Sequence, residues 1–212
     1  MNRPITCLAI ALLASACSEG AAAPDTTPET TPASATPSAP STAEARLTGD
    51  HLWQVDPAAS RLVFRATQEG APFEGEFREF DVQVNLDPED LSDAAILAVI
   101  DPESAFTGDG NRDGTLPGPE WFDVVRFPEA RFRSNDVSCE GGACVARGDL
   151  TIKETTRAVE LPFTLRVEGD RAVADGGLTL VRLDYDLGTD AFVSDTQVGY
   201  PVEVVLHVEA TR

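Results

Sequence analysis

The chain has 212 residues, which allows one sizeable domain or two small ones. Its 36 acidic and 16 basic side chains give a net charge of −20 at pH 7. Such a surface repels phosphate backbones, which argues against nucleic-acid binding, and it also repels anionic lipid headgroups. Any attachment to a membrane must therefore be hydrophobic or covalent.

The N-terminus has the pattern of an export signal. A short positive start precedes the apolar run Ile5–Ala16, which is too short to span a bilayer. Its end, Leu13–Cys17, is similar to the lipobox of bacterial lipoproteins, in which cleavage leaves a lipidated cysteine first. This resemblance implies a signal peptide over residues 1–16 and lipidation of Cys17. With Ser18 next, it also implies an outer-membrane anchor that faces the periplasm. Ordinary cleavage before an unmodified cysteine is the alternative.

Residues 17–45 differ in composition from the rest of the chain. They are mostly Ala, Pro, Ser and Thr, with almost no large apolar side chain. Such a segment cannot bury enough surface to offset the entropy of the chain. We predict that it is a disordered tether ahead of one folded domain over residues 46–212.

From about His51 onward the pattern is that of β-strands. Apolar and polar residues alternate, as antiparallel strands with one buried face require, through 61–66, 80–86, 159–167 and 202–208. Glycine pairs such as Gly141-Gly142 separate these runs at hairpin spacing. We predict an all-β fold of about eight antiparallel strands, closed into a lipocalin-like barrel with room for one elongated ligand. A sandwich filled by its own side chains is the alternative.

Two irregularities interrupt the strand pattern. The inward phase changes from odd positions at Phe77 to even positions at Phe80, which predicts a bulge at Arg78-Glu79 that bends the strand. Residues 118–124 carry a proline near their start and predict one short helical segment.

Two cysteines remain beyond the predicted lipidation site. Cys139 and Cys144 flank the glycine turn at Gly141-Gly142, so in an oxidising compartment they are expected to form a local structural disulfide. A redox-active pair is the alternative, but no basic or helical neighbour is at hand to lower a thiol pKa.

Several segments of the folded domain carry a resemblance to a known family: Trp53–Phe64, Gly75–Phe80, Gly108–Asp113, Leu116, Trp121–Val124, Phe127–Phe132, Gly148–Lys153, Val159–Pro162 and Arg182–Gly188. Through these segments the chain resembles the YceI-like family over residues 51–209. The resemblance implies an exported barrel that binds a polyisoprenoid or quinone-like lipid, in some members beside a di-haem membrane cytochrome. Formation of a homodimer is an alternative that the sequence leaves open. Thr115 and Trp121 replace residues common in the family, which leaves the identity of the lipid open.

The predicted ligand contacts are aromatic residues on inward strand phases or on the helical segment. They are Phe64, Phe77, Phe80, Trp121, Phe122, Phe127, Phe132 and Phe163. Each could instead simply fill the core. Because a buried CH₂ contributes roughly 0.8 kcal/mol, hydrophobic burial alone can hold a prenyl chain. Arg182 is in phase with Leu178 and Leu180 and is expected to face a polar headgroup at the barrel mouth, or to pair with Asp184 or another carboxylate.

Two other functions compete with lipid binding. Residues 109–120 match the spacing of an EF-hand calcium loop, but Pro117 and Pro119 stiffen its second half, so we expect no metal site and no cofactor. The sequence has only the histidines His51 and His207 and lacks HExxH, P-loop and GxGxxG motifs. We therefore predict a non-catalytic binding protein. A scaffold or adhesion module with a solid core is the other non-catalytic alternative.

Overall fold

The computed structural model describes residues 46–212. The predicted signal peptide, Cys17 and the linker up to residue 45 lie outside the described residues. Within 46–212, every helix is too short or too polar to cross a membrane.

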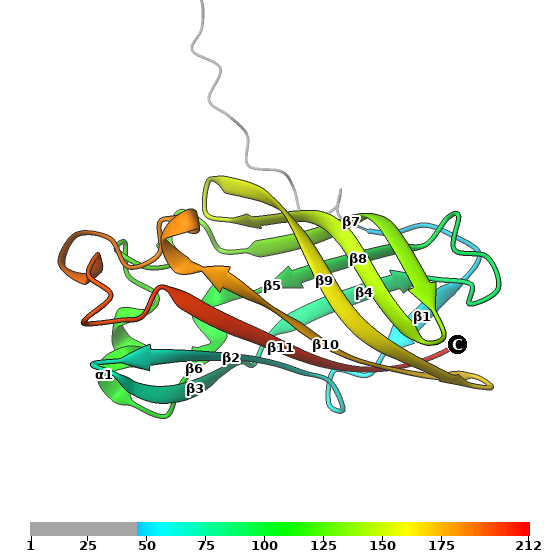
Figure 1. Cartoon of the computed structure of the whole chain (residues 1–212), viewed down its shortest axis with the longest axis horizontal. Helices are drawn as coiled ribbons and strands as arrows, with labels where there is room; N and C mark the ends of the chain where they lie inside the picture. Colours follow the sequence, from blue (N-terminus) through cyan, green and yellow to red (C-terminus); the bar gives the residue numbers. More distant parts are fainter. Residues whose placement is uncertain (1–45) are drawn as a thin grey trace, which may run out of the picture. The chain divides into compact units, whose positions relative to one another are not determined.

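The described part consists mostly of strands (Figure 1). The strands are β1 (Leu52–Val55), β2 (Arg61–Gln68), β3 (Ala71–Phe77), β4 (Phe80–Asn85), β5 (Ala95–Ile100), β6 (Ala105–Phe106), β7 (Ala130–Glu140), β8 (Ala143–Ile152), β9 (Thr155–Glu168), β10 (Arg171–Val181) and β11 (Pro201–Thr211). The helical elements are η2 (Pro102–Ser104), α1 (Gly110–Thr115), η3 (Arg182–Tyr185) and η4 (Asp190–Phe192).

The strands form a closed barrel. Eight of them make a ring of antiparallel pairs in the order β1-β4-β5-β7-β8-β9-β10-β11, and β11 pairs with β1 to close it. This confirms the predicted eight-stranded antiparallel barrel. The other strands extend the wall beyond β11 in the order β2-β3-β6. Because β11 pairs with β2 through Glu203–His207 and with β1 through Ala210–Thr211, β1 and β2 are the two halves of one interrupted strand.

The bulge expected at Arg78-Glu79 is a break between two strands. β3 pairs with β2 and β6, whereas β4 pairs with β1 and β5, and the two residues between them leave both ladders. The adjacent chain turns at the same corner, since Arg78 N donates to Ser104 O (3.3 Å) and Asp101 N donates to Glu79 O (3.0 Å). The prediction of a bend here is therefore right in position, but the prediction of one continuous strand is wrong.

The short helix lies earlier in the chain than predicted. Helix α1 spans Gly110–Thr115, and the Asp109 carboxylate caps it by accepting hydrogen bonds from the first free N–H groups. Pro117 and Pro119 have no N–H to continue the helix, so residues 118–124 form a series of turns. The expectation of a helix over 118–124 is wrong for that reason.

The ladder between β9 and β10 ends partway along both strands. Its last pair is Phe163 with Gly176, next to Pro162, which has no N–H to donate. A Cβ on Gly176 would lie 2.6 Å from Phe163 Cβ, so the two strands approach closely just before they part. Beyond this point η3 lies against β9, and Arg157 Nε donates to Asp184 O (2.8 Å).

At the hairpin between β7 and β8, Cys139 and Cys144 face each other across the ladder and form a disulfide. This confirms the predicted pairing. Cys144 is 3% exposed and belongs to a core cluster with Phe132, Phe163 and Ala146. The disulfide therefore joins the hairpin at a point that is already anchored in the core.

Candidate functional site

The barrel encloses a cavity of about 460 Å³. Inward-facing apolar side chains from nearly every strand line it, and the lining extends from Trp53 on β1 to Asn111 on α1. In Figure 1, β1 and α1 lie at opposite ends of the barrel. Among the described residues, the lining includes no His, Cys, Asp or Glu side chain. Its main chemical capacity is therefore to remove apolar ligand surface from water.

Most of the predicted ligand contacts line this cavity. They are Phe64, Phe77, Phe80, Trp121, Phe122, Phe132, Phe163 and Arg182. Phe127 does not line it. The Arg126 guanidinium carbon instead lies 4.9 Å from the centre of the Phe127 ring. The expectation for Phe127 assumed a helical face that the chain does not form. For the seven aromatic residues that line the cavity, contact with a ligand stays a prediction.

A row of phenylalanine rings in tilted and edge-to-face contact forms one wall of the cavity. The ring centres of Phe64 and Phe77 are 5.2 Å apart, and those of Phe77 and Phe122 are 5.9 Å apart with an edge-to-face arrangement. Phe73 meets Phe64 edge to face at 6.4 Å. Because such contacts add roughly 0.5–1.5 kcal/mol each to simple burial, the wall is preorganised around the cavity.

Arg182 has a different role from either predicted one. Its side chain is buried, with the residue 1% exposed. Its Nη1 donates to Leu187 O and Gly188 O, both at 2.8 Å, and its Nη2 donates to Phe192 O (2.6 Å) and Val198 O (2.9 Å). Burial lowers the pKa of Arg182, and carbonyl oxygens take the place of a carboxylate partner.

The two expected partners of Arg182 are therefore wrong for geometric reasons. Asp184 pairs with Arg157, with 3.4 Å between Arg157 Nη2 and Asp184 Oδ1. All three nitrogens of the Arg182 guanidinium group donate to carbonyl oxygens, so none is left for a ligand headgroup. Arg182 fixes the segment between Leu187 and Val198.

Two segments meet over the α1 end of the cavity, and we call them together the lid: residues 107–129 and residues 182–199. Gly188 N donates to Glu120 O (2.7 Å), and the ring centres of Trp121 and Phe192 are 5.5 Å apart. Both segments lie at the left end of the barrel in Figure 1. The lid closes the cavity on the side where β9 and β10 have parted.

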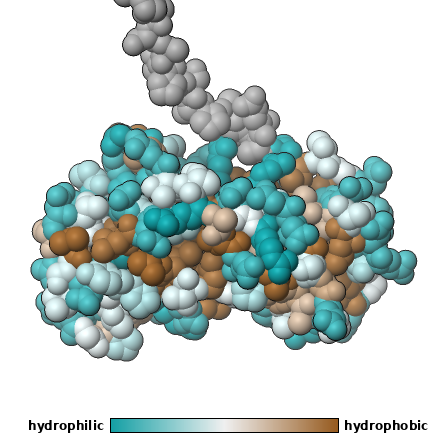
Figure 2. All heavy atoms as spheres, turned by 45° about the horizontal axis from the view of Figure 1, so that its top comes forward, coloured by the Kyte–Doolittle hydropathy of each residue, from teal (hydrophilic) through white to brown (hydrophobic). Residues whose placement is uncertain are grey.

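The lid also exposes apolar side chains to the outside. Val125 is 93% exposed and Val193 is 54% exposed, one from each lid segment. On the face that Figure 2 displays, apolar patches lie between hydrophilic regions. Although the chain is strongly acidic, the surface of the described residues carries apolar as well as hydrophilic patches.

Tyr185 is a cavity residue that the sequence analysis did not identify. Tyr185 is 2% exposed and lines the cavity, and burial raises the pKa of its hydroxyl. Tyr185 Oη and Trp121 Nε1 are buried and have no hydrogen-bond partner within residues 46–212. The aromatic position in the segment Arg182–Gly188, which carries the family resemblance, was the signal that could have identified Tyr185.

The calcium-loop spacing does not produce a calcium loop. Asp109 caps α1, and Asp113 Oδ1 accepts hydrogen bonds from Thr107 N and Thr107 Oγ1, both at 2.7 Å. The helical turn over Gly110–Thr115 replaces the extended loop that places EF-hand ligands around one ion. No group of three or more His, Cys, Asp or Glu side chains in residues 46–212 is arranged to hold a metal ion.

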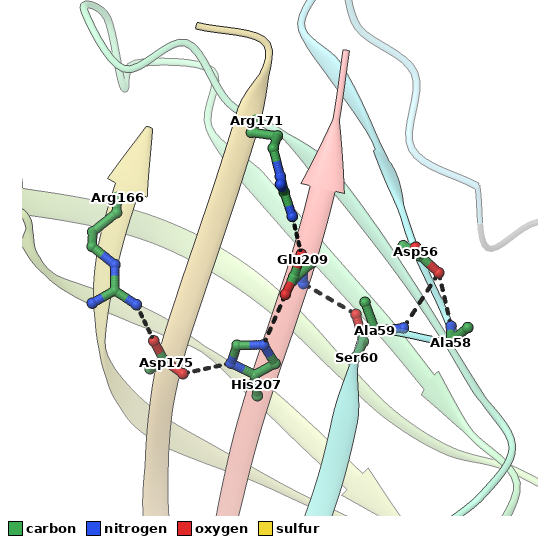
Figure 3. A network of polar contacts seen from close by, with 9 residues as sticks. All are labelled: Asp56, Ala58, Ala59, Ser60, Arg166, Arg171, Asp175, His207 and Glu209. Atoms are coloured by element: carbon green, nitrogen blue, oxygen red, sulfur yellow. Dashed lines mark hydrogen bonds and ion pairs between the residues drawn. The ribbon is translucent and has the colours of Figure 1, made fainter. Parts of the chain in front are cut away.

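A polar network covers the outer face of β9, β10 and β11 (Figure 3). His207 Nδ1 lies 2.6 Å from Asp175 Oδ1, and His207 Nε2 lies 3.5 Å from Glu209 Oε1. Arg166 pairs with Asp175 (2.9 Å), and Arg171 pairs with Glu209 (2.7 Å). The hydrogen bond to Asp175 raises the pKa of His207, and the Glu209 carboxylate adds to this. The network lies outside the cavity and ties adjacent strands together.

Comparisons with known proteins agree with this architecture. The family model of the YceI-like domain matches residues 53–210. Protein YceI of Salmonella arizonae is 28% identical over 144 residues, which cover 65% of this chain and 73% of that protein. The crystal structure of BcnA from Burkholderia cenocepacia has a TM-score of 0.72 and 30% sequence identity, and it covers 74% of this chain and 100% of that chain.

A polyisoprenoid binding domain from Saccharophagus degradans has a TM-score of 0.60 at 15% identity, covering 76% of this chain and 98% of that chain, and it shows a shared fold. The matched range 53–210 starts at Trp53 in β1 and ends at Ala210, which pairs with Val55 of β1 where the ring closes. This chain therefore belongs to the YceI-like family.

Proposed function

We propose that this chain is a non-catalytic carrier of a long apolar lipid of the polyisoprenoid or prenyl-quinone type. The observation that carries the proposal is the predominantly apolar lining of a cavity of about 460 Å³. That volume falls within the range of ligand sites for small molecules. A flexible hydrocarbon chain fits such a lining because each CH₂ that it buries contributes roughly 0.8 kcal/mol without any polar partner.

Two further points support a lipid over a polar metabolite. All three nitrogens of the Arg182 guanidinium group donate to backbone carbonyl oxygens, so Arg182 has no free N–H group for a small anion. The neighbouring fold from Saccharophagus degradans is that of a protein described as a polyisoprenoid binding domain. The cavity also argues against the alternative of a scaffold with a solid core, because a solid core leaves no such volume.

The proposal extends to the location of the protein. We propose that the chain is exported, that a diacylglycerol group on Cys17 anchors it to a membrane, and that the barrel works on the periplasmic side. The lipobox-like sequence Leu13–Cys17 supports this, together with the Ala-, Pro-, Ser- and Thr-rich segment that follows it. A carrier held near a membrane can exchange its cargo with that membrane.

Lipid extraction tests the carrier function directly. The full chain, purified in mild detergent, should yield at least one prenyl lipid by mass spectrometry in a fixed ratio to protein. Removing that lipid should lower the melting temperature, because a ligand that binds only the folded state stabilises it. Extraction that yields only the phospholipid composition of the membrane, with no effect on melting, would contradict the proposal.

A further inference from the structure

The wall of the barrel has a gap between β9 and β10. Within residues 46–212, residues 155–162 of β9 pair only with β8, and residues 177–181 of β10 pair only with β11. In Figure 1 the two strands diverge from their shared hairpin toward the lid. Because the backbone groups at these two edges are not joined into a ladder, the wall can part here without breaking any strand pairing.

The cavity reaches this gap from the inside. Val159 and Leu161 on β9 and Leu178 and Leu180 on β10 flank the gap and line the cavity. Of these, Val159, Leu178 and Leu180 are half-buried. An apolar molecule that passes between the two strands therefore meets carbon surface on both sides of its path, which favours its transfer out of water.

Exposed side chains bridge the gap near η3, and we call these residues the latch: Lys153, Thr155 and Arg157 on one side, Asp184 and Asp186 on the other. Arg157 Nε donates to Asp184 O (2.8 Å), and Arg157 Nη2 lies 3.4 Å from Asp184 Oδ1. Lys153 Nζ donates to Asp186 O (2.8 Å), and Thr155 Oγ1 donates to Asp186 Oδ2 (3.3 Å). The side chains of Arg157 and Asp184 are both 49% exposed. Because water competes for such exposed contacts, the latch holds weakly.

The other side of the gap is held much more firmly. Arg182 is 1% exposed, and all three nitrogens of its guanidinium group donate to carbonyl oxygens between Leu187 and Gly199. Arg182 N also donates to Tyr200 O (2.9 Å), directly before β11. Breaking buried hydrogen bonds costs more than breaking exposed ones. We therefore expect η3 to stay with β10 and β11 while β9 moves away.

Tyr185 closes the gap from within. It lies between Asp184 and Asp186 of the latch, is 2% exposed and lines the cavity. Its hydroxyl has no hydrogen-bond partner in the described part of the chain. Burial raises the pKa of Tyr185, and the charge of the nearby Arg157 acts in the opposite direction. When β9 parts from η3, this hydroxyl can bond to water, which lowers the cost of opening.

We propose that the apolar ligand enters and leaves the cavity sideways, through the gap between β9 and β10, and that the latch controls the rate of this exchange. The inference rests on the proposed carrier function and adds the route of the cargo. None of the latch residues belongs to the cavity lining. A change in the latch therefore alters the association and dissociation rates together and leaves the affinity unchanged.

Retinol, a fluorescent isoprenoid alcohol, serves as the probe. Its association is followed by stopped-flow mixing with the delipidated full chain, and its dissociation by transfer to an excess of phosphatidylcholine vesicles. Arg157→Ala should raise both rate constants about threefold, the fold-change that one exposed ion pair is worth, with Kd unchanged. Arg147→Ala is the matched control and should change neither rate. Arg147 is 48% exposed and pairs with Asp136 and Glu160, but it bridges strands whose ladders are intact.

A covalent lock tests the same route in the opposite direction. Arg157→Cys with Asp184→Cys removes the latch pair, and a dimaleimide with the reach of an arginine side chain joins the two positions again. These chains also carry Cys7→Ser and Cys17→Ser, so that the introduced thiols alone react. The unlinked chain should exchange retinol as fast as Arg157→Ala. The linked chain should exchange it about tenfold more slowly than the unaltered protein, with the same Kd.

The control for the lock is Arg147→Cys with Glu160→Cys, linked by the same reagent across the β8–β9 ladder, where these residues are direct partners. It should exchange retinol at the rate of the unaltered protein. A slowing equal to that of the linked gap would show that the reagent acts by stiffening the barrel, and the inference would fail.

The remaining outcomes separate this inference from the carrier function. If the linked and unlinked gap chains bind retinol and exchange it equally fast, the gap is not the route, although the carrier function stands. If Arg157→Ala weakens binding without raising the association rate, the latch acts on the closed cavity and the inference is overturned. If retinol does not bind the delipidated chain at all, both the carrier function and the inference fail.

Discussion

The ring of Phe64 lies directly over Gly75, its partner across the β2–β3 ladder, so closely that a Cβ on Gly75 would overlap the Phe64 ring. Gly75 is buried, and Phe64 is 7% exposed and lines the cavity. The absence of a side chain at Gly75 therefore sets where the Phe64 ring lies on the cavity wall. The glycine at position 75 of β3 therefore affects the shape of the cavity.

Gly75→Ala should destabilise the protein by about 1–3 kcal/mol, because the new methyl group forces Phe64 to move within a packed wall. The same movement should reduce the room for a ligand and weaken lipid binding. Urea unfolding gives the stability, and lipid extraction gives the occupancy. Gly110→Ala is the control, since nothing lies within 4 Å of a Cβ there and a helical alanine is favourable. Equal losses of stability and lipid binding in the two variants would contradict the conclusion that Gly75 positions the Phe64 ring.

Ala66→Trp should expel the lipid and leave the barrel folded. Ala66 is 9% exposed and lines the cavity, so an indole ring at this position occupies the volume that the ligand needs. We expect lipid occupancy to fall by about tenfold or more, and stability to change by about 1–3 kcal/mol. Ala158→Trp, at an exposed position on β9, should retain its lipid. Full occupancy in the Ala66 variant would show that the lipid lies elsewhere.

Arg182→Met should loosen the lid and not simply weaken binding. Removing the guanidinium group leaves the carbonyl oxygens of Leu187, Gly188 and Phe192 without their donor, at a cost of about 3 kcal/mol or more. Amide hydrogen exchange should rise across residues 186–199 while the β7–β8 hairpin stays protected. Arg182→Lys should not restore protection, because one ammonium group cannot reach all these oxygens. A uniform increase in amide exchange along the chain would indicate global destabilisation instead.

The network around His207 predicts a pH dependence of stability with a defined sign. The pKa of His207 is raised in the folded state above its ordinary value of 6.5, first by the hydrogen bond to Asp175 and then by Glu209. Its stabilising contribution is therefore fully present below about pH 6.5 and is lost as the pH rises through the raised folded value. The effect should be modest, since the His207 side chain is 35% exposed.

The measurement is the difference in melting temperature between the wild type and His207→Gln from pH 5 to pH 9, at constant ionic strength. The difference should be largest at acidic pH and should shrink toward alkaline pH. Asp175→Asn should remove most of this dependence, because it deletes the largest cause of the shift. A difference that grows with rising pH would contradict the sign.

Cys17→Ser should release the chain from the membrane fraction, because a thioether-linked diacyl group is the attachment that we propose. The check is the distribution between pellet and supernatant after a carbonate wash, followed by immunodetection. The unaltered chain should remain in the pellet. If the variant also stays there, the protein is held by another attachment, and the lipoprotein proposal fails.

The sequence predicts the strands better than the way they are interrupted. Alternation of apolar and polar residues places β4, β9 and β11 because each has one face on the cavity. It cannot show that the chain breaks at Arg78-Glu79, since a bulge and a break produce the same change of phase. That choice depends on Ser104 and Asp101, which are distant in sequence and bond to the corner.

Strand periodicity also predicts only part of the cavity lining. Inward aromatic residues such as Phe132 and Phe163 are predictable because strand periodicity fixes their face. Phe127 and Arg182 lie in irregular segments, where periodicity gives no direction. The partners of Arg182 are backbone carbonyl oxygens, which every residue carries, so no sequence pattern marks them. A buried arginine without a carboxylate partner can be recognised only from the structure.

The pairing of β1 with β11 has a consequence for how the protein folds. The ring closes only when Gln54 and Val55 meet Thr211 and Ala210, which are separated by most of the folded domain. Contacts between residues so far apart in sequence form slowly, because closing the long loop costs entropy before the contacts add any stability. Synthesis of β11 must therefore precede closure, and a nascent chain that lacks it has no complete core. For a protein that we propose to be exported, this delay favours passage through the membrane before folding.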